Sequence, residues 1–159
     1  ATPLQSAILA GEDLTGTTLF VMDEKVDHGP VLGSSQTPLL DSDTYTTLAD
    51  KLAEASAELL VQALPKYLSG EITPVAQNED DATYTKKFTG EDGQVNLDKD
   101  DALAVWRKVR ALNPEPGVWT LRQAQGKLKR MKILAADVVG TQLVLRKVQF
   151  DGELPKDVL

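Results

Sequence analysis

The feature that most constrains the fold is a polar stretch at residues 71–89, where the hydrophobic periodicity of the rest of the chain stops. Pro74 interrupts this stretch, and residues 78–81 are too polar to bury. A chain of 159 residues can form one ordinary domain or two small ones. We therefore expect two domains, at residues 1–70 and 90–159, joined by a linker that crosses a surface.

The first domain is predicted to contain a strand, a loop and a second strand. Residues 17–22 and 31–39 are rich in β-forming side chains, and a polar loop at 23–29 separates them. That loop holds carboxylates and the histidine His28, and catalytic groups are often presented on such loops. The alternative is a hydrophilic turn whose aspartates, including Asp27, only cap backbone amides.

A long amphipathic helix should follow at residues 44–68, because apolar residues recur there at helical intervals. Thr44 is a suitable N-cap residue, and Gly70 lies just past the expected end. Pro65 should disturb the last turn, since proline has no amide hydrogen to donate.

The second domain is predicted to contain a helix and a small open barrel. Asp98 or Asp100 can cap the helix, which should end at residues 113–114, where proline follows asparagine. The barrel is expected because short β-rich runs, separated by glycine-containing turns, follow at residues 118–121, 128–134 and 142–148.

The net charge of −7 hides a strong asymmetry along the chain. Residues 1–101 carry 19 acidic and 6 basic side chains, whereas residues 102–132 carry eight basic side chains against the lone acid Glu115. A basic stretch within an acidic chain can attract phosphate groups, and it can equally be a solvated face without a partner.

Composition argues against several kinds of site. The sequence has no cysteine, which excludes disulfides and thiolate metal sites, and one histidine does not suffice for a histidine-based zinc site. No apolar run approaches the roughly 18 residues of a membrane span, and the sequence shows no signal-peptide pattern. We expect a cytoplasmic protein that uses no metal and does not bind a membrane.

Five blocks of sequence together carry a family resemblance. They lie at residues 1–8, 15–32, 48–53, 77–87 and 109–119. In this order they resemble the methionyl-tRNA formyltransferase family. The second block, which includes the polar loop, indicates the wider class of folate-dependent formyltransferases, and the last block has the spacing N-P-x-P-G-x-W that narrows the resemblance to the tRNA enzyme.

The resemblance implies an α/β, Rossmann-like formyltransferase domain, of which residues 1–70 are the C-terminal part, followed by an OB-like β-barrel domain that binds tRNA. It implies transfer of a formyl group from 10-formyltetrahydrofolate to the amino group of methionyl initiator tRNA. Asp27 matches the family's catalytic aspartate, which works with an upstream asparagine and histidine that this sequence lacks. We therefore expect this chain to be inactive alone, and the full-length enzyme to be a monomer.

The resemblance also assigns binding residues. The polar loop matches the family's folate loop, whose main-chain groups contact the pterin ring, and His28 is expected to be a loop residue without a catalytic role. The expected folate contacts are Met22, Asp23, Glu24, Val26 and Gly29. The candidate tRNA contacts are Lys86, Lys87, Arg107, Lys108, Arg110, Lys127, Lys129, Arg130 and Lys132. We expect Trp106 and Trp119 to pack in the core rather than to stack on bases.

The sequence departs from the family pattern in two places. Glu115 replaces a frequent tryptophan, and the segment between Ile133 and Leu143 is too short for two further strands that the family commonly has. Two alternatives therefore stay open. A sugar-nucleotide formyltransferase fragment would share the aspartate loop but would lack the N-P-x-P-G-x-W block and the basic stretch. A non-catalytic RNA-binding module would explain the second half but not the first.

Overall fold

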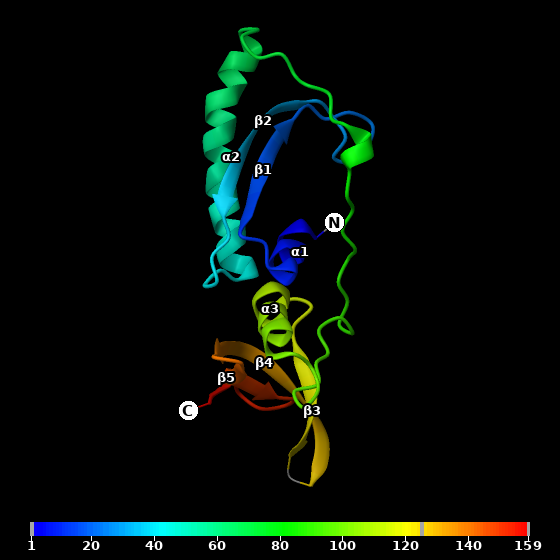
Figure 1. Ribbon diagram of the computed structural model, residues 1–159, viewed down its shortest axis with the longest axis vertical. Helices are drawn as coiled ribbons and strands as arrows, with labels where there is room; N and C mark the ends of the chain where they lie inside the picture. Colours follow the sequence, from blue (N-terminus) through cyan, green and yellow to red (C-terminus); the bar gives the residue numbers. More distant parts are fainter. Residues whose placement is uncertain (1, 125, 159) are drawn as a thin grey trace. The chain divides into compact units, whose positions relative to one another are not determined.

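The computed structural model describes residues 2–124 and 126–158. Contacts within the chain divide it into two compact units, which we call unit 1 and unit 2 (Figure 1). Unit 1 combines Ala1–Gly11 with Thr85–Leu159, and unit 2 is the continuous segment Glu12–Tyr84. These units differ from the predicted domain ranges chiefly in the first residues of the chain, whose contacts are with the C-terminal part.

Unit 2 consists of an antiparallel strand pair and one long helix. β1 (Leu14–Phe20) pairs with β2 (Val31–Pro38), and α2 (Tyr45–Leu68) packs on this pair through its buried residues Leu48 and Leu52. Burial alternates along both strands, as expected where one face of a strand pair is covered. The predicted order of strand, loop, strand and helix is confirmed, although β1 begins earlier than the predicted run.

The start of α2 follows from its capping residues. The Thr44 hydroxyl accepts a hydrogen bond from the Thr47 amide, and the Thr47 hydroxyl accepts one from the Thr44 amide, which is a reciprocal capping box. Thr44 is therefore the N-cap, as predicted. Pro65 lies inside the helix, which continues to Leu68, so the proline does not end the helix early.

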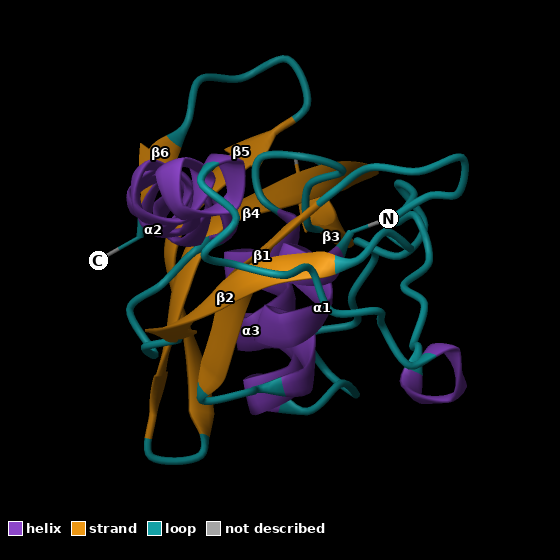
Figure 2. Ribbon diagram, turned by 90° about the horizontal axis from the view of Figure 1, so that it is seen from above, coloured by secondary structure: helices purple, strands orange, loops and turns teal. Residues whose placement is uncertain are grey.

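The chain between α2 and the next helix is mostly irregular, as the loss of hydrophobic periodicity predicted (Figure 2). A short 3-10 turn, η1 (Glu79–Asp81), begins after Asn78, whose side chain accepts a hydrogen bond from the Asp80 amide. Val75 and Val31 exchange two backbone hydrogen bonds of 2.7 and 2.9 Å. The irregular segment is thereby attached to the first residue of β2.

Unit 1 contains two helices that pack on each other, α1 (Pro3–Ala10) and α3 (Ala102–Leu112), and a sheet that α3 covers. The buried side chains Ile8, Val105 and Leu112 come from these two helices. They form the core of unit 1 with apolar residues of the sheet. In the part of the chain that the structure describes, no helix is both long and apolar enough to cross a membrane.

The predicted N-cap residue of α3 is wrong, although it lies close to the observed one in the sequence. The N-cap residue is Asp101, whose carboxylate accepts a hydrogen bond of 2.9 Å from the Ala104 amide, and neither Asp98 nor Asp100 has this role. The Asp100 carboxylate instead accepts from the Asn96 amide at 2.8 Å. Asp100 therefore holds the turn before the helix, and the next aspartate in the run caps it. The helix ends at Asn113, as predicted.

The sheet of unit 1 is antiparallel, with its strands in chain order. β3 (Trp119–Ala124), β4 (Lys127–Val139), β5 (Gln142–Phe150) and β6 (Lys156–Asp157) each pair with the next strand. Among the described residues no ladder joins β6 to β3, so the predicted barrel is not closed by strand pairing. The two residues of β6 pair with β5 alone, which leaves too short an edge for closure.

The short segment between Ile133 and Leu143 has a simple explanation in the structure. β4 continues to Val139 and then turns at Gly140, which has a φ of +62°, directly into β5. Two register shifts between Ile133 and Ala136 bend β4 along its length. The sheet is thus a continuous hairpin at this place, with no room for inserted strands.

Candidate functional site

The loop between β1 and β2 has an unusual backbone conformation. Asp27 has a φ of +54°, in the left-handed region that side chains other than glycine seldom adopt. Gly29 is buried, and a Cβ atom there would overlap the carbonyl oxygen of Val21. The Val21 amide donates a hydrogen bond of 2.9 Å to the Pro30 carbonyl and closes the base of the loop. The exposed Asp27 side chain therefore stands on a tightly defined turn.

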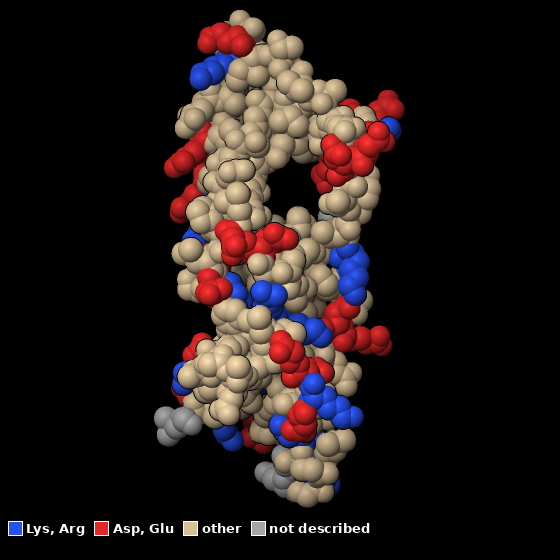
Figure 3. All heavy atoms as spheres, in the orientation of Figure 1, with Lys and Arg blue, Asp and Glu red and all other residues tan. Residues whose placement is uncertain are grey.

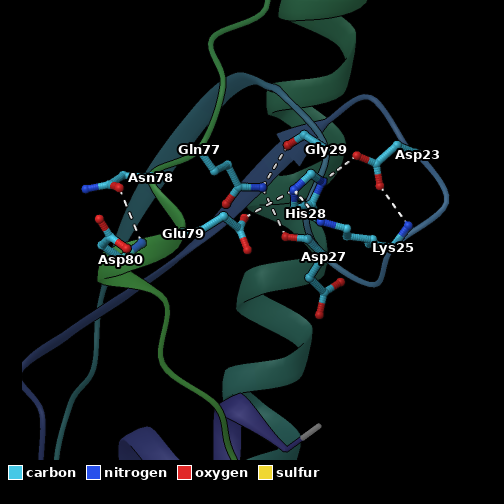
Figure 4. Close-up of polar contacts among 9 residues, drawn as sticks. All are labelled: Asp23, Lys25, Asp27, His28, Gly29, Gln77, Asn78, Glu79 and Asp80. Carbon is cyan, nitrogen blue, oxygen red and sulfur yellow. Dashed lines mark hydrogen bonds and ion pairs between the residues drawn. The ribbon is translucent and has the colours of Figure 1, made fainter.

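The imidazole of His28 lies in a cluster of charged groups. Its Nδ1 atom is 2.5 Å from a carboxylate oxygen of Asp23, and its Nε2 atom is 3.5 Å from both the Glu79 carboxylate and the Lys25 ammonium (Figure 4). The hydrogen bond with His28, followed by one from the Lys25 amide, holds the pKa of Asp23 below its ordinary value. In Figure 4 the Asp27 carboxylate points away from this cluster. His28 therefore pairs with Asp23 and not with its neighbour Asp27.

A glutamine from the irregular segment holds the same loop. The side-chain amide of Gln77 donates hydrogen bonds of 3.0 Å to the Asp27 carbonyl and 2.7 Å to the Gly29 carbonyl (Figure 4). These residues are 50 and 48 positions apart in the sequence. Gln77 begins one of the blocks that resemble the family, but the sequence did not predict its contact, because no local pattern indicates which distant carbonyls a polar linker residue will meet.

The five predicted folate-contact residues all lie in this loop, but their side chains have different surroundings. Met22 and Val26 are 85% and 87% exposed, which is unusual for such apolar side chains. Glu24 is exposed as well, whereas the Asp23 carboxylate contacts His28 and Gly29 is buried. The loop thus presents two apolar side chains to solvent.

The predicted basic residues that precede the sheet have several kinds of partner. The Lys86 ammonium lies 2.5 Å from Asp92, and the Lys108 ammonium donates to the Gln94 carbonyl at 3.2 Å. The Arg107 guanidinium donates to the Ala10 carbonyl at 3.4 Å and so links α3 to α1. Lys87 is exposed. The lysine–aspartate pair, together with hydrogen bonds from Thr89, lowers the pKa of Asp92 to about 2.

Arg110 is placed differently from the other basic residues. It is only 8% exposed, and its guanidinium lies 4.3 Å from the centroid of the Trp106 ring. A guanidinium over an aromatic face is stabilised by the ring quadrupole. Arg110 therefore packs against Trp106 on α3 and is largely shielded from solvent.

The hairpin of β3 and β4 brings basic, aromatic and apolar side chains to one face. The Arg130 guanidinium lies 3.8 Å from the centroid of the Trp119 ring, and Trp119 is paired in register with Lys132. Leu121 and Leu128 are exposed on the same two strands. Strand alternation puts these five residues on one face, which we call the hairpin face.

Lys127 and Lys129 lie on the opposite side of β4. Lys127 is exposed next to the turn, and the Lys129 ammonium lies 3.8 Å from the Glu153 carboxylate. Figure 3 shows basic and acidic side chains mixed on the visible part of unit 1. The excess of basic residues in the sequence is therefore partly balanced by neighbouring carboxylates in the fold.

Two family models match separate stretches of the chain. The sequence model described as "Formyl transferase" matches residues 1–64, and the one described as "Formyl transferase, C-terminal domain" matches residues 87–153. Among solved structures, HypX from Aquifex aeolicus in complex with tetrahydrofolic acid matches 99% of this chain and 31% of its own, with a TM-score of 0.75 and 20% identity. At that identity the likeness concerns the fold.

Curated relatives give a closer match in sequence. The methionyl-tRNA formyltransferase of Halorhodospira halophila is 44% identical over 117 residues, which are 74% of this chain and 37% of the relative. That of Bartonella henselae is 36% identical over 156 residues, which are 98% of this chain and 48% of the relative. The chain thus spans less than half the length of these relatives. With both formyl transferase regions matched, the chain belongs to the formyltransferase family, as a homologue of methionyl-tRNA formyltransferases.

Proposed function

We propose that this chain is part of an enzyme that transfers a formyl group from 10-formyltetrahydrofolate to the amino group of methionyl initiator tRNA. The observation that carries the proposal is the 36–44% identity to methionyl-tRNA formyltransferases along most of the chain. We further propose that residues 1–70 belong to a Rossmann-like catalytic domain and residues 90–159 to an OB-like domain, linked by 71–89. In this proposal the full-length enzyme is a cytoplasmic monomer.

Asp27 is the proposed catalytic residue of this chain. Formyl transfer passes through a tetrahedral intermediate with negative charge on the formyl oxygen, and the attacking amine must lose a proton. An upstream asparagine and histidine, implied by the family resemblance, would stabilise that oxygen. The Asp27 carboxylate, exposed on its turn, would orient the imidazole of that histidine and favour its protonated form. It would also accept the amine's proton, directly or through water. His28 is occupied by Asp23, which agrees with a role outside the reaction.

The folate site is proposed to include the loop residues Met22, Asp23, Glu24, Val26 and Gly29. Backbone groups of a tightly held loop can hydrogen-bond the edge of a pterin ring, and the exposed Met22 and Val26 side chains can cover its apolar faces. The irregular segment leaves the Met22 and Val26 side chains exposed, whereas the Gln77 amide already donates to the Gly29 carbonyl.

The tRNA contact is proposed to centre on the hairpin face. Arg130 and Lys132 are exposed there, and Lys127 and Lys87 are exposed elsewhere in unit 1. Phosphates can approach these cations freely, and the stacked pair of Arg130 and Trp119 offers a flat cationic surface. Lys86, Arg107, Lys108, Arg110 and Lys129 have protein contacts that would have to be shared with a phosphate.

The first experiment tests the reaction. The part of the Halorhodospira halophila relative that precedes the matched region is joined to this chain, and formylation of methionyl initiator tRNA is measured with 10-formyltetrahydrofolate. We expect activity in the chimaera, none in this chain alone, and none in the chimaera with Asp27→Ala. Asp50→Ala, at an exposed position of α2, is the control. A folded chimaera that formylates an amino-sugar nucleotide in place of the tRNA would support the sugar alternative.

The second experiment tests the tRNA contact on this chain. Charge reversal at Arg130 and Lys132, the two cations of the hairpin face, should weaken binding of initiator tRNA in a fluorescence anisotropy titration, and the affinity should fall with added salt. Lys66→Glu, on exposed α2, is the matched control and should have a smaller effect. Equal loss in the control variant would contradict the assignment. Strong tRNA binding in a chimaera without formylation would support the RNA-binding alternative.

A further inference from the structure

The irregular segment contacts the start of β2 and the loop between β1 and β2 through three of its residues. The Val75 backbone pairs with Val31, the Gln77 side chain binds two loop carbonyls, and the Glu79 carboxylate approaches the His28 imidazole. We define residues 75–79 as the strap. Val75 makes its contact through the backbone, Gln77 through its side-chain amide, and Glu79, the first residue of η1, through its carboxylate. The strap is thus attached at three points along its length.

We propose that Gln77 is a positioning residue that sets the backbone conformation of Asp27, and this inference rests on the proposed function of Asp27. Gln77 touches no reacting group in this assignment. It acts through the backbone carbonyls of Asp27 and Gly29, the two residues that flank His28.

The two hydrogen bonds bear directly on the backbone around Asp27. Its positive φ costs energy for a residue with a Cβ atom, although aspartate tolerates this region better than most residues. The Asp27 carbonyl belongs to the peptide unit that follows this φ, so fixing its direction restrains the turn. Both hydrogens of one side-chain amide are suited to two carbonyls that converge on it.

Other contacts do not replace this restraint. Gly29 has to remain without a side chain because of Val21, which fixes the end of the turn but not the direction of the Asp27 carboxylate. His28 and Asp23 tie the other side of the loop together. Without the Gln77 amide, the Asp27 carbonyl can turn to water, and the carboxylate would then sample positions away from the reacting amine.

Substitutions can separate the hydrogen bonds from the bulk of the side chain. Gln77→Glu keeps the size but replaces the amide donor with a carboxylate that repels both carbonyls. Gln77→Ala removes the side chain. Gln62→Glu makes the same chemical change at an exposed position of α2 and serves as the control.

The first test is made on this chain by NMR. A residue with positive φ gives a strong nuclear Overhauser effect between its own amide and α protons, and we expect this signal at Asp27 in the wild type and in Gln62→Glu. It should weaken in Gln77→Glu and Gln77→Ala, while the signals of α2 and the thermal midpoint stay nearly unchanged. An unaltered Asp27 signal in both Gln77 variants would overturn the proposal.

The second test uses the chimaera described above. Gln77→Glu should lower kcat about 10- to 100-fold, the cost expected for a misplaced reacting group, with little change in KM for the folate. Loss of activity in Asp27→Ala together with full activity in Gln77→Glu would overturn the positioning role and leave the proposed function intact. Activity retained in Asp27→Ala would instead sink the catalytic assignment, and the NMR result would still decide whether Gln77 sets the turn.

Discussion

The buried carboxylate of Asp43, just before α2, offers a sharp test of what stabilises unit 2. It is 2% exposed, accepts a hydrogen bond of 2.8 Å from the Leu40 amide, and lies 2.7 Å from the Lys51 ammonium. The Thr47 hydroxyl donates to it at 3.2 Å. The carboxylate thus joins the chain before the helix to the first two turns of α2. We predict that Asp43→Asn destabilises this unit without changing its fold.

The expected magnitude follows from these contacts. A hydrogen bond to a charged group contributes about 1.5–3 kcal/mol, and exposure of the Lys51 side chain reduces its share through solvent screening. An asparagine oxygen can still accept from one donor, so we expect a loss of about 2 kcal/mol at pH 7. Asp43→Ala, which leaves all the donors without this acceptor, should cost more.

The same carboxylate predicts a pH dependence. Burial alone would raise the pKa of Asp43, but the hydrogen bonds from Lys51 and Leu40 outweigh it, and the pKa lies below the ordinary value of 3.8. The stabilisation is therefore fully present above pH 3.8 and is lost as the pH falls through the lower, folded-state pKa. The difference in stability between wild type and Asp43→Asn should shrink over that acidic range.

The two units allow the effect to be localised by spectroscopy. Both tryptophans lie in unit 1, whereas α2 is the longest helix described and contributes strongly to far-ultraviolet circular dichroism. In urea unfolding, Asp43→Asn should shift the dichroism transition more than the tryptophan fluorescence transition. Asp50→Asn, exposed on α2, is the matched control. Equal stability of wild type and Asp43→Asn at pH 7 would refute the reasoning.

Three further predictions concern other parts of the chain. Ile133→Ala, at a fully buried position, should destabilise unit 1 by about 2–5 kcal/mol, measured by tryptophan fluorescence during unfolding, and a loss below that of Ile133→Val would contradict it. Gly29→Ala should distort the Asp27 turn, because its Cβ would overlap the Val21 carbonyl, and unchanged amide shifts there would count against this. The paired Asp92 carboxylate stabilises the wild type above pH 3.8, and this contribution is lost as the pH falls towards about 2. Asp92→Asn should lack it, so its free energy of unfolding should depend less on pH over that range.

The order of elements could be predicted because it depends on local chemistry. Thr44 caps α2, and α3 ends at Asn113. The loss of apolar periodicity after Gly70 marks the irregular segment. Each of these features depends on residues that are close together in the sequence. The cap of α3 was misplaced because several aspartates in one run are equally able to cap, and only the backbone conformation selects Asp101.

The assignment of single residues was less predictable. A basic side chain in the sequence can be free, paired or buried, and the fold decided that Arg110 packs on Trp106 while Arg130 stacks on Trp119 at an exposed face. The proximity of Asp27 and His28 in the sequence did not indicate a pair either. In the structure the imidazole contacts Asp23, five residues earlier in the chain.

The sequence by itself determined the family, most of the strand and helical segments, and the loop that carries Asp27, because motif identity and hydrophobic period are properties of short stretches. The tertiary structure decided which distant groups meet. Gln77 reaches the Asp27 loop across 50 residues, α1 packs on α3, and the last strand is too short to close the sheet. Such contacts depend on the path of the whole chain, since a polar or apolar side chain specifies what it can bind but not what the fold brings to it.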